Sequence, residues 1–443
     1  MDLPGVPPQL FELLVASAGR SRIALVGGAV RDLLLHRVHH DPWRGLPDLD
    51  LVVEGDGMAE PAAPLLARRL ANRLPSPVLS WKEHGAYGTV EMALQLPRST
   101  EGEPPSPSRP LAPAGLLPPA GDGSPGADGA GGMILLDVAT ARRESYPVAG
   151  ENPLVSFGRL EHDLARRDFS INAMALLLEG PALLDPHGGQ RDLAERKLRL
   201  LHAASVRDDP TRLLRAARYA ARLGFSLAME SQEQARQTLA DWPWAWRPGD
   251  PPGEAPPALG TRLRMELQLL LEREPWPQAL AALQQWHGLL LLDPALQADR
   301  TWRRRLRWAD RLGVPLIVAL AAGAGDPLAL AERLQLPQRQ HHLLAAFLEL
   351  RQRIRREGPK AARSPTHWTA LLENPATPPL AVALALAAGA GPRRPLMRWW
   401  FRWRHLGSPV SARELMSLGV VPGPALGKRL RKLRDARLRQ ERC

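Results

Sequence analysis

Two aspartates separated by a single residue, Asp48 and Asp50, are the side chains in this sequence best suited to metal-dependent chemistry. They open an apolar run typical of a β-strand, so both side chains project from the same face at the strand's N-terminal edge. Neighbouring carboxylates repel each other unless a cation lies between them, and nucleotide chemistry commonly supplies Mg²⁺. The pair therefore predicts a magnesium site carried on a strand.

A glycine pair, Gly27 and Gly28, lies upstream of the aspartates, between an apolar strand-like run and a short predicted helix that carries Arg31. Glycines at such a turn let backbone N–H groups and the helix N-terminus approach phosphate oxygens. No Walker lysine follows and the GxGxxG pattern is absent, so neither a P-loop nor a dinucleotide fingerprint fits. A plain turn with two surface aspartates is the structural alternative. The combination with the Asp-x-Asp strand favours phosphoryl transfer.

A second charged motif lies in residues 160–178, LEHDLARRDFSINAMALLL, which we interpret as one helix. In such a helix Asp168 and Asn172 are one turn apart and share a face. Arg167 can hold triphosphate oxygens with both arms of its guanidinium. The structural alternative is a solvated arginine pair beside a capping aspartate.

A third motif, DDPTRLLRAARYAARLGF, predicts a helix that ends at Gly224. Asp209 can accept a hydrogen bond from an exocyclic amino group while Arg212 donates to the adjacent ring nitrogen. Cytosine and adenine offer that edge, whereas guanine and uracil do not, so the motif predicts a preference for C and A. The alternative is a basic helix whose N-terminal aspartate complements the helix dipole. Arginines three residues apart form a slowly winding stripe on this helix, comprising Arg212, Arg215 and Arg218.

Length and charge limit the classes of protein that the chain can belong to. A chain of 443 residues is longer than one hydrophobic core usually supports, so we expect two or more domains. Its net charge of +12 favours a polyanionic partner, nucleic acid before membrane. The single cysteine, Cys443, excludes an internal disulfide, a zinc finger and a cysteine nucleophile. The N-terminus has no basic region typical of a signal peptide, and the longest apolar runs fall short of the roughly 20 residues that a membrane span requires. We therefore expect a cytoplasmic protein.

Four motifs in this order, LVGGAVRD…DLD, DVATARRESY, LARRDFSINAMAL and DDPTRLLRAARYAARLGF, closely resemble the class II tRNA nucleotidyltransferase and bacterial poly(A) polymerase family. The resemblance covers about residues 22–226. It implies an α+β fold in which a polymerase-β-like head, a mixed sheet with helices, is followed by helical neck, body and tail domains that hold tRNA. By composition and motif we place the head at residues 1–180, the neck at 181–242, a Pro-rich linker at 243–260, and the body and tail at 261–443.

The resemblance also assigns roles residue by residue. It implies that Asp48 and Asp50 bind Mg²⁺, that Gly28 and Arg31 contact the nucleotide, and that Arg167 belongs with the triphosphate. It implies that the protein template for the incoming CTP or ATP consists of Asp209, Arg212, Arg215 and Arg218. Together with the glycine turn, the expected nucleotide-binding set is Gly27, Gly28, Arg31, Arg167, Asp209, Arg212, Arg215 and Arg218.

The chain departs from the family pattern at several places. The neck motif begins Asp-Asp where the family usually has Glu-Asp, and Thr261 replaces the first glutamate of the stretch LGTRLRMELQLLL. Residues 97–132, rich in Pro, Gly, Ser and Ala, predict a disordered and removable insertion in the head. Asp137 and Glu91 are the two candidates for a third catalytic carboxylate, but each can equally be a structural acid at the end of a strand, and we favour the structural role for both.

The C-terminal half carries two further basic stretches. The run from residue 393 to 407 interleaves arginines with Trp399, Trp400 and Trp403, which suits either base stacking or a helix core, and we favour the core. A plausible surface for the RNA backbone consists of Lys428, Arg429, Arg431, Lys432 and Arg434.

We therefore expect an enzyme that completes the CCA end of tRNA from CTP and ATP. The alternatives within the enzymes are a version that adds only CC or only A, and a poly(A) polymerase. The alternative of another class is a catalytically idle RNA-binding protein, against which the intact Asp48 and Asp50 pair argues.

Overall fold

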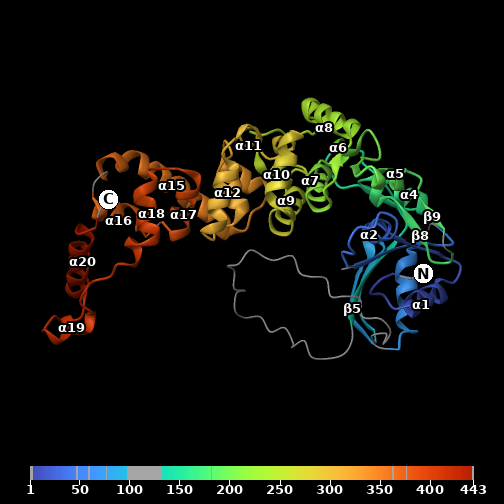
Figure 1. Cartoon of the computed structure of the whole chain (residues 1–443), viewed down its shortest axis with the longest axis horizontal. Coiled ribbons are helices and arrows are strands. Elements are labelled where there is room, and N and C mark those ends of the chain that lie inside the picture. The colour runs from blue at the N-terminus through green and yellow to red at the C-terminus, as the bar shows by residue number, and fades with distance from the viewer. Residues whose placement is uncertain are drawn as a thin grey trace. The chain divides into compact units, whose positions relative to one another are not determined.

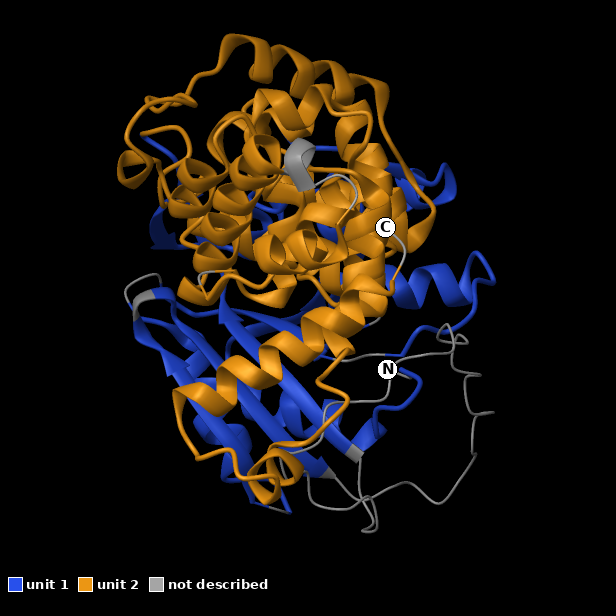
Figure 2. Cartoon of the chain, turned by 90° about the vertical axis from the view of Figure 1, so that its left-hand side faces the viewer, with its two compact units in different colours: residues 1–147, 153–202 blue, residues 148–152, 203–443 orange. Residues whose placement is uncertain are grey.

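The computed structural model describes residues 3–45, 48–57, 60–75, 77–96, 132–180, 182–361, 364–375 and 377–441. The chain folds as two compact units (Figure 2). Unit 1 comprises Met1–Pro147 and Pro153–His202, and unit 2 comprises Val148–Asn152 and Ala203–Cys443. The predicted insertion at 97–132 lies outside the described residues, except for Gly132, which begins a strand.

Unit 1 is built on a seven-stranded mixed sheet in the order β3-β4-β5-β2-β1-β8-β9. Strands β2 and β5 pair in parallel, and the other neighbouring strands of this sheet pair antiparallel. The strands of the sheet are β1 (Arg22–Val26), β2 (Asp48–Glu54), β3 (Val78–His84), β4 (Thr89–Leu96), β5 (Gly132–Thr140), β8 (Ala175–Leu177) and β9 (Leu183–Leu184). A separate hairpin is formed by β6 (Arg142–Ser145) and β7 (Leu154–Phe157).

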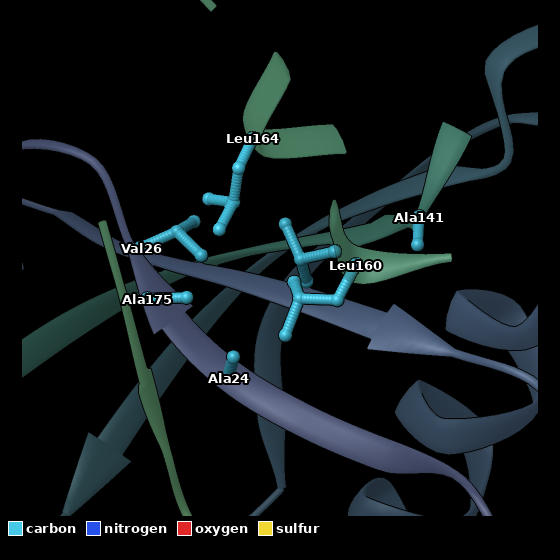
Figure 3. Close-up of a cluster of buried hydrophobic side chains, with 7 residues drawn as sticks. Ala24, Val26, Ala141, Leu160, Leu164 and Ala175 are labelled. Carbon is cyan, nitrogen blue, oxygen red and sulfur yellow. The ribbon is translucent and has the colours of Figure 1, made fainter. Parts of the chain in front are cut away.

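Helices cover this sheet, and its interior strand β1 is buried on both faces, as its continuous apolar run predicts. On one side Ala24 and Val26 pack against Leu160 and Leu164 of α4 (Leu160–Ala165) (Figure 3). The helices and remaining short strand of unit 1 are α1 (Pro8–Ala18), α2 (Gly28–Arg37), α3 (Ala62–Ala71), α4 (Leu160–Ala165), α5 (Gly189–Ala194) and β10 (Lys197–Leu198). Burial of one such leucine contributes about 1.5–3 kcal/mol, so this packing helps to hold β1, and the turn that follows it, in place.

Unit 2 is largely helical (Figure 1). Its elements are α6 (Ser205–Asp208), α7 (Thr211–Leu223), β11 (Ser226–Leu227), α8 (Met229–Asp241), α9 (Thr261–Arg273), α10 (Trp276–Gln285), α11 (Pro294–Ala298), α12 (Trp302–Arg311), α13 (Leu316–Ala321), α14 (Pro327–Arg333), α15 (Gln338–Ala361), α16 (Pro365–Leu372), α17 (Pro379–Ala388), α18 (Arg393–Phe401), α19 (Ala412–Ser417) and α20 (Pro424–Arg439). Helix α7 ends at Gly224 in the left-handed conformation, as predicted. In the described part of the chain no helix has the length and apolarity to cross a membrane.

One secondary-structure prediction is wrong. Residues 160–178 do not form a single helix, because α4 ends at Ala165, a 3₁₀ turn spans Ser170–Asn172, and β8 follows at Ala175–Leu177. The apolar run after the arginine pair is taken up as a strand beside β1, where it gains sheet hydrogen bonds and burial. A short apolar run satisfies either element by itself, so tertiary pairing decided the outcome.

Tryptophans in unit 2 are mostly structural. Trp399 and Trp403 are buried, which confirms the core interpretation for both. Trp244 and Trp246, in the segment expected to be a linker, are also buried, and their indole N–H groups donate to the carbonyls of Arg207 and Pro251.

Candidate active site

Three carboxylates lie on one face of the unit 1 sheet, at neighbouring positions of its parallel strand pair. Asp50 of β2 is directly opposite Asp137 of β5, and Asp48 is opposite Leu135. Because side chains alternate along a strand, Asp48, Asp50 and Asp137 project to the same side. None of the three side chains has a hydrogen bond or ion pair to another described residue.

The electrostatics of these carboxylates reflect their mutual repulsion. Burial raises the pKa of Asp50, and Asp48 adds to this effect, while the guanidiniums of Arg167 and Arg31 oppose it. Burial and then repulsion from Asp50 and other neighbouring carboxylates raise the pKa of Asp137 to about 6. A divalent cation would relieve this repulsion, so the adjacent and unpartnered oxygens of Asp48 and Asp50 fit Mg²⁺.

The third carboxylate was left open between Asp137 and Glu91, and the structure separates the two. Glu91 of β4 lies opposite Asp137, one strand further from β2. It accepts from His84 at 3.2 Å and forms an ion pair with Lys82 at 3.6 Å. No three His, Cys, Asp or Glu side chains of the described residues are gathered closely enough to hold a metal, so the candidate metal site is the aspartate pair.

Gly27 lies where the Asp-x-Asp strand and the arginine motif come together. Its φ of +68° favours glycine, and a Cβ built there would lie 3.1 Å from Asp50 Oδ2 and 3.1 Å from Arg167 Nη1. Gly28 starts α2, and its Cβ would lie 3.4 Å from Arg31 Nη2. The glycine turn, the Asp-x-Asp strand and the arginine motif, predicted separately, therefore meet at one place in unit 1.

Arg167 is oriented by a buried aspartate that the sequence analysis did not single out. Asp163 is fully buried and accepts from Arg167 at 3.0 Å and from Arg166 at 2.7 Å. Burial raises the pKa of Asp163, but the two guanidiniums outweigh it and hold the pKa below its usual range. Arg166 also donates to Glu144 at 3.0 Å, so Arg166 serves the core while Arg167 reaches Gly27. The three- and four-residue spacing of Asp163 from Arg166 and Arg167, which directly follow α4, is the signal that would have found this residue.

Arg31 is buried and held in place by its own network. Its guanidinium donates to Asp32 at 2.8 and 2.9 Å and to Asn172 Oδ1 at 3.0 Å. Asn172 in turn donates to Asp168 at 3.0 Å. Asp168 and Asn172 are therefore in contact, as a shared helix face would also place them, but the contact is made at a 3₁₀ turn and not in the predicted helix.

The expected base-reading residues lie in unit 2, at the start of α7. Asp209 and Arg212 are both buried. The Asp209 carboxylate accepts from the Thr211 backbone N–H at 3.1 Å and hydroxyl at 2.6 Å, and from Arg262 of α9. Arg212 donates to the Ser205 carbonyl at 3.4 Å. Both side chains are thus fixed in orientation by the protein.

The rest of the arginine stripe is neutralised by α9. Arg215 and Arg218 donate to Glu266 at 3.4 and 2.5 Å, and Arg218 also donates to Glu274 at 3.3 Å. The sequence analysis named neither glutamate and did not name Arg262. The signal was present, because Arg262 and Glu266 are one helical turn apart in the stretch LGTRLRMELQLLL.

Comparison with known proteins fits this arrangement. Residues 129–199 match the poly(A) polymerase head domain family. The CC-adding tRNA nucleotidyltransferase of Deinococcus radiodurans is 34% identical over 94% of this chain and 85% of its own length. The chain belongs to the class II tRNA nucleotidyltransferase and poly(A) polymerase family. Another relative, the A-adding tRNA nucleotidyltransferase of Aquifex aeolicus, is 34% identical over an alignment that covers 49% of this chain and 20% of that protein.

Solved structures of CCA-adding enzymes share the fold of this family member. An apo CCA-adding enzyme has a TM-score of 0.64 at 21% identity, covering 98% of this chain and 92% of its own. The Thermotoga maritima CCA-adding enzyme complexed with tRNA has a TM-score of 0.63 at 20% identity, covering 99% and 93%. The expected fold class, a mixed sheet with helices followed by a largely helical region, is confirmed.

We expect Gly27→Ala to lower the rate of nucleotide addition by about 100-fold, because a misplacement of about 1 Å among reacting groups costs that much. The added Cβ meets Asp50 Oδ2 and Arg167 Nη1 at 3.1 Å, in a backbone conformation that favours glycine. Single-turnover kinetics measure the effect. Gly85→Ala is the control, since Gly85 of the same unit has no positive φ and a Cβ added there meets nothing within 4 Å. Equal rates for the two variants would contradict the assignment.

We expect Arg262→Met to raise KM for the nucleotide and to weaken discrimination between bases, because Asp209 loses the cation that orients it. Arg264→Met on the same helix is the control, because Arg264 donates to the Gln335 carbonyl and lies away from Asp209. Steady-state kinetics with CTP and UTP give both quantities. An unchanged CTP-to-UTP preference in Arg262→Met would show that Arg262 has no part in base choice.

Proposed function

We propose that this chain adds the CCA sequence to the 3′ end of tRNA from CTP and ATP, without a nucleic-acid template. The observation that carries the proposal is the meeting of Gly27, Asp50 and Arg167 in unit 1, in a chain whose unit 2 carries the Asp209 and Arg212 edge. Membership of the tRNA nucleotidyltransferase family supports the same class of reaction.

In the proposed reaction the oxygen of the tRNA 3′ hydroxyl attacks the α-phosphorus of the nucleotide, and the bond to the pyrophosphate oxygen breaks. Asp48 and Asp50 would hold Mg²⁺, which when bound neutralises triphosphate charge and activates the hydroxyl. Arg167 and the backbone N–H groups of the glycine turn bind triphosphate oxygens. Asp137, with its pKa of about 6, is ionised at neutral pH and can accept the proton of the hydroxyl.

Base choice in this proposal is made by the protein. Asp209 accepts from the exocyclic amino group of cytosine or adenine, and Arg212 donates to the neighbouring ring nitrogen. Guanine and uracil place a carbonyl opposite the Asp209 carboxylate and a ring N–H opposite the Arg212 guanidinium. Each mismatch leaves buried polar groups unpaired, which costs about 1–3 kcal/mol per group.

A second candidate is addition of CC alone. The relative named as CC-adding aligns along 94% of this chain, which favours this narrower specificity. The proposed catalytic residues of unit 1 would serve either reaction, because the phosphoryl transfer step is the same for every base.

We expect purified protein to add C to tRNA transcripts that lack CCA or end after the first C, and to add A to transcripts that end in CC. UTP and GTP should react at least about 100-fold more slowly than CTP and ATP, because a site built to hydrogen-bond one base edge strongly rejects a base with a different edge. Gel analysis with each labelled nucleotide measures this. Addition that stops after CC would establish the second candidate. UTP incorporation close to that of CTP would disprove the Asp209 template, and binding of tRNA with no addition would disprove the enzyme.

A further inference from the structure

The short helix α6 leads into the base-reading residues, and its last backbone carbonyls need partners from outside the helix. It spans only Ser205–Asp208, and the chain leaves it at Asp209 in an extended conformation. The last carbonyls of any helix have no hydrogen-bond donor within that helix, and a helix this short has almost no stability of its own. The position of Asp209 therefore depends on what holds the end of α6.

Trp244 supplies the first partner. Its side chain is buried, and its indole N–H donates to the carbonyl of Arg207, two residues before Asp209, at 3.0 Å. Trp242 packs edge-on against the Trp244 ring, with 5.0 Å between the ring centroids and 87° between the ring planes. The segment 243–260, predicted as a linker, is therefore tied to α6 by an indole that is itself held in orientation.

Gly150 supplies the second partner, and it lies against the same indole ring. It belongs to unit 2, and its backbone N–H donates to the Asp208 carbonyl at 3.2 Å. Its φ is +78°, and a Cβ built on it would lie only 2.8 Å from Cδ1 of Trp244. Glycine permits both this backbone conformation and the close approach to the ring. Trp244 and Gly150 thus hold two adjacent carbonyls at the end of α6, and we define them together as the Trp244 brace.

The brace also holds the segment that leads into α9. The Gly150 carbonyl accepts from the backbone N–H of Ala258 at 3.1 Å, and α9 begins three residues later. Arg262, the second residue of α9, forms the ion pair with Asp209. Both members of this ion pair are therefore attached to the brace through backbone only a few residues away.

We propose that Trp244 is a positioning residue for base selection, which acts on Asp209 through the end of α6; this rests on the proposed function. Trp244 itself does not touch the base. Asp209 selects a base by the hydrogen bond that its carboxylate accepts, and such a bond weakens steeply when its geometry is distorted. When the end of α6 loses its partners, Asp209 shifts relative to Arg262, and the preference for the amino-bearing edge falls. A tryptophan that only filled the core would change stability and leave base preference as it is.

The test removes one indole N–H and compares the result with a second replacement of the same kind. Trp244→Phe keeps an aromatic ring against Gly150 and removes the donor to the Arg207 carbonyl. Trp246→Phe is the matched control, because Trp246 is also buried in the same segment and its indole N–H also donates at 3.0 Å, to the Pro251 carbonyl. Equilibrium binding of CTP and of UTP to the full chain, with Mg²⁺ and without tRNA, gives the base preference of each protein.

We expect Trp244→Phe to lower the ratio of CTP to UTP affinity about tenfold, the scale of one lost hydrogen bond, and Trp246→Phe to keep it within about twofold of wild type. In steady-state addition Trp244→Phe should raise KM for CTP and leave kcat within about twofold, because the catalytic carboxylates are unchanged. An unchanged affinity ratio in Trp244→Phe would overturn the proposal. An equal fall in both variants would overturn it too, and so would a wild type that binds CTP and UTP equally.

A second variant reaches the brace from its other side and decides the matter where Trp244→Phe does not fold. Gly150→Ala places a Cβ against the same ring and should also lower the affinity ratio about tenfold. Gly249→Ala is its control, since Gly249 has a φ of +109° and a Cβ added there meets nothing within 4 Å. Equal ratios in these two variants would overturn the proposal. A wild type that binds CTP selectively but adds no nucleotide would refute the proposed function, and the binding comparison would still decide the role of Trp244.

Discussion

The repulsion between carboxylates on one face of the unit 1 sheet is the constraint on which the rest of the site depends. Asp50 and Asp137 are opposite each other on the parallel strands β2 and β5, and Asp48 is two residues before Asp50. Folding alone gains nothing from this arrangement: burial and then repulsion from Asp50 and its neighbours raise the pKa of Asp137 to about 6. The surrounding structure tolerates the repulsion because β1, buried on both faces, anchors β2 and the glycine turn.

The two arginines nearest to this face, Arg31 and Arg167, are held in place by hydrogen bonds to other residues. Arg31 is held by Asp32 and Asn172, and Arg167 is held by the buried Asp163. Neither arginine forms an ion pair with Asp48 or Asp50 in the described part of the chain, so these two carboxylates stay available. The same logic recurs in unit 2, where Arg262 and Thr211 orient Asp209. In both units, partners outside the reacting set fix side chains before a nucleotide arrives, which lowers the reorganisation needed for catalysis.

The sequence predicts those features that depend on residues close together in the chain, and not those that depend on distant pairing. The common face of Asp48 and Asp50 depends only on the period of a strand, and the end of α7 only on Gly224. The strand β8 was mistaken for a helix because its apolar residues suit both elements, and pairing with β1 is a long-range event. The partnership of Asp209 with Arg262 joins residues 53 positions apart, which no local period reveals. The position of Asp137 opposite Asp50 likewise required the register of two strands.

The central claim, that Asp48 and Asp50 repel each other until Mg²⁺ binds, is tested most directly by thermal unfolding with and without Mg²⁺. Wild-type protein should gain stability as Mg²⁺ rises, because a ligand that binds only the folded state stabilises it. Asp50→Asn should unfold at a higher temperature than wild type in the absence of the ion and should gain little when it is added. Asp56→Asn, an exposed aspartate of the same unit, should respond to Mg²⁺ as wild type does. An equal Mg²⁺-dependent shift in Asp50→Asn and wild type would contradict the account.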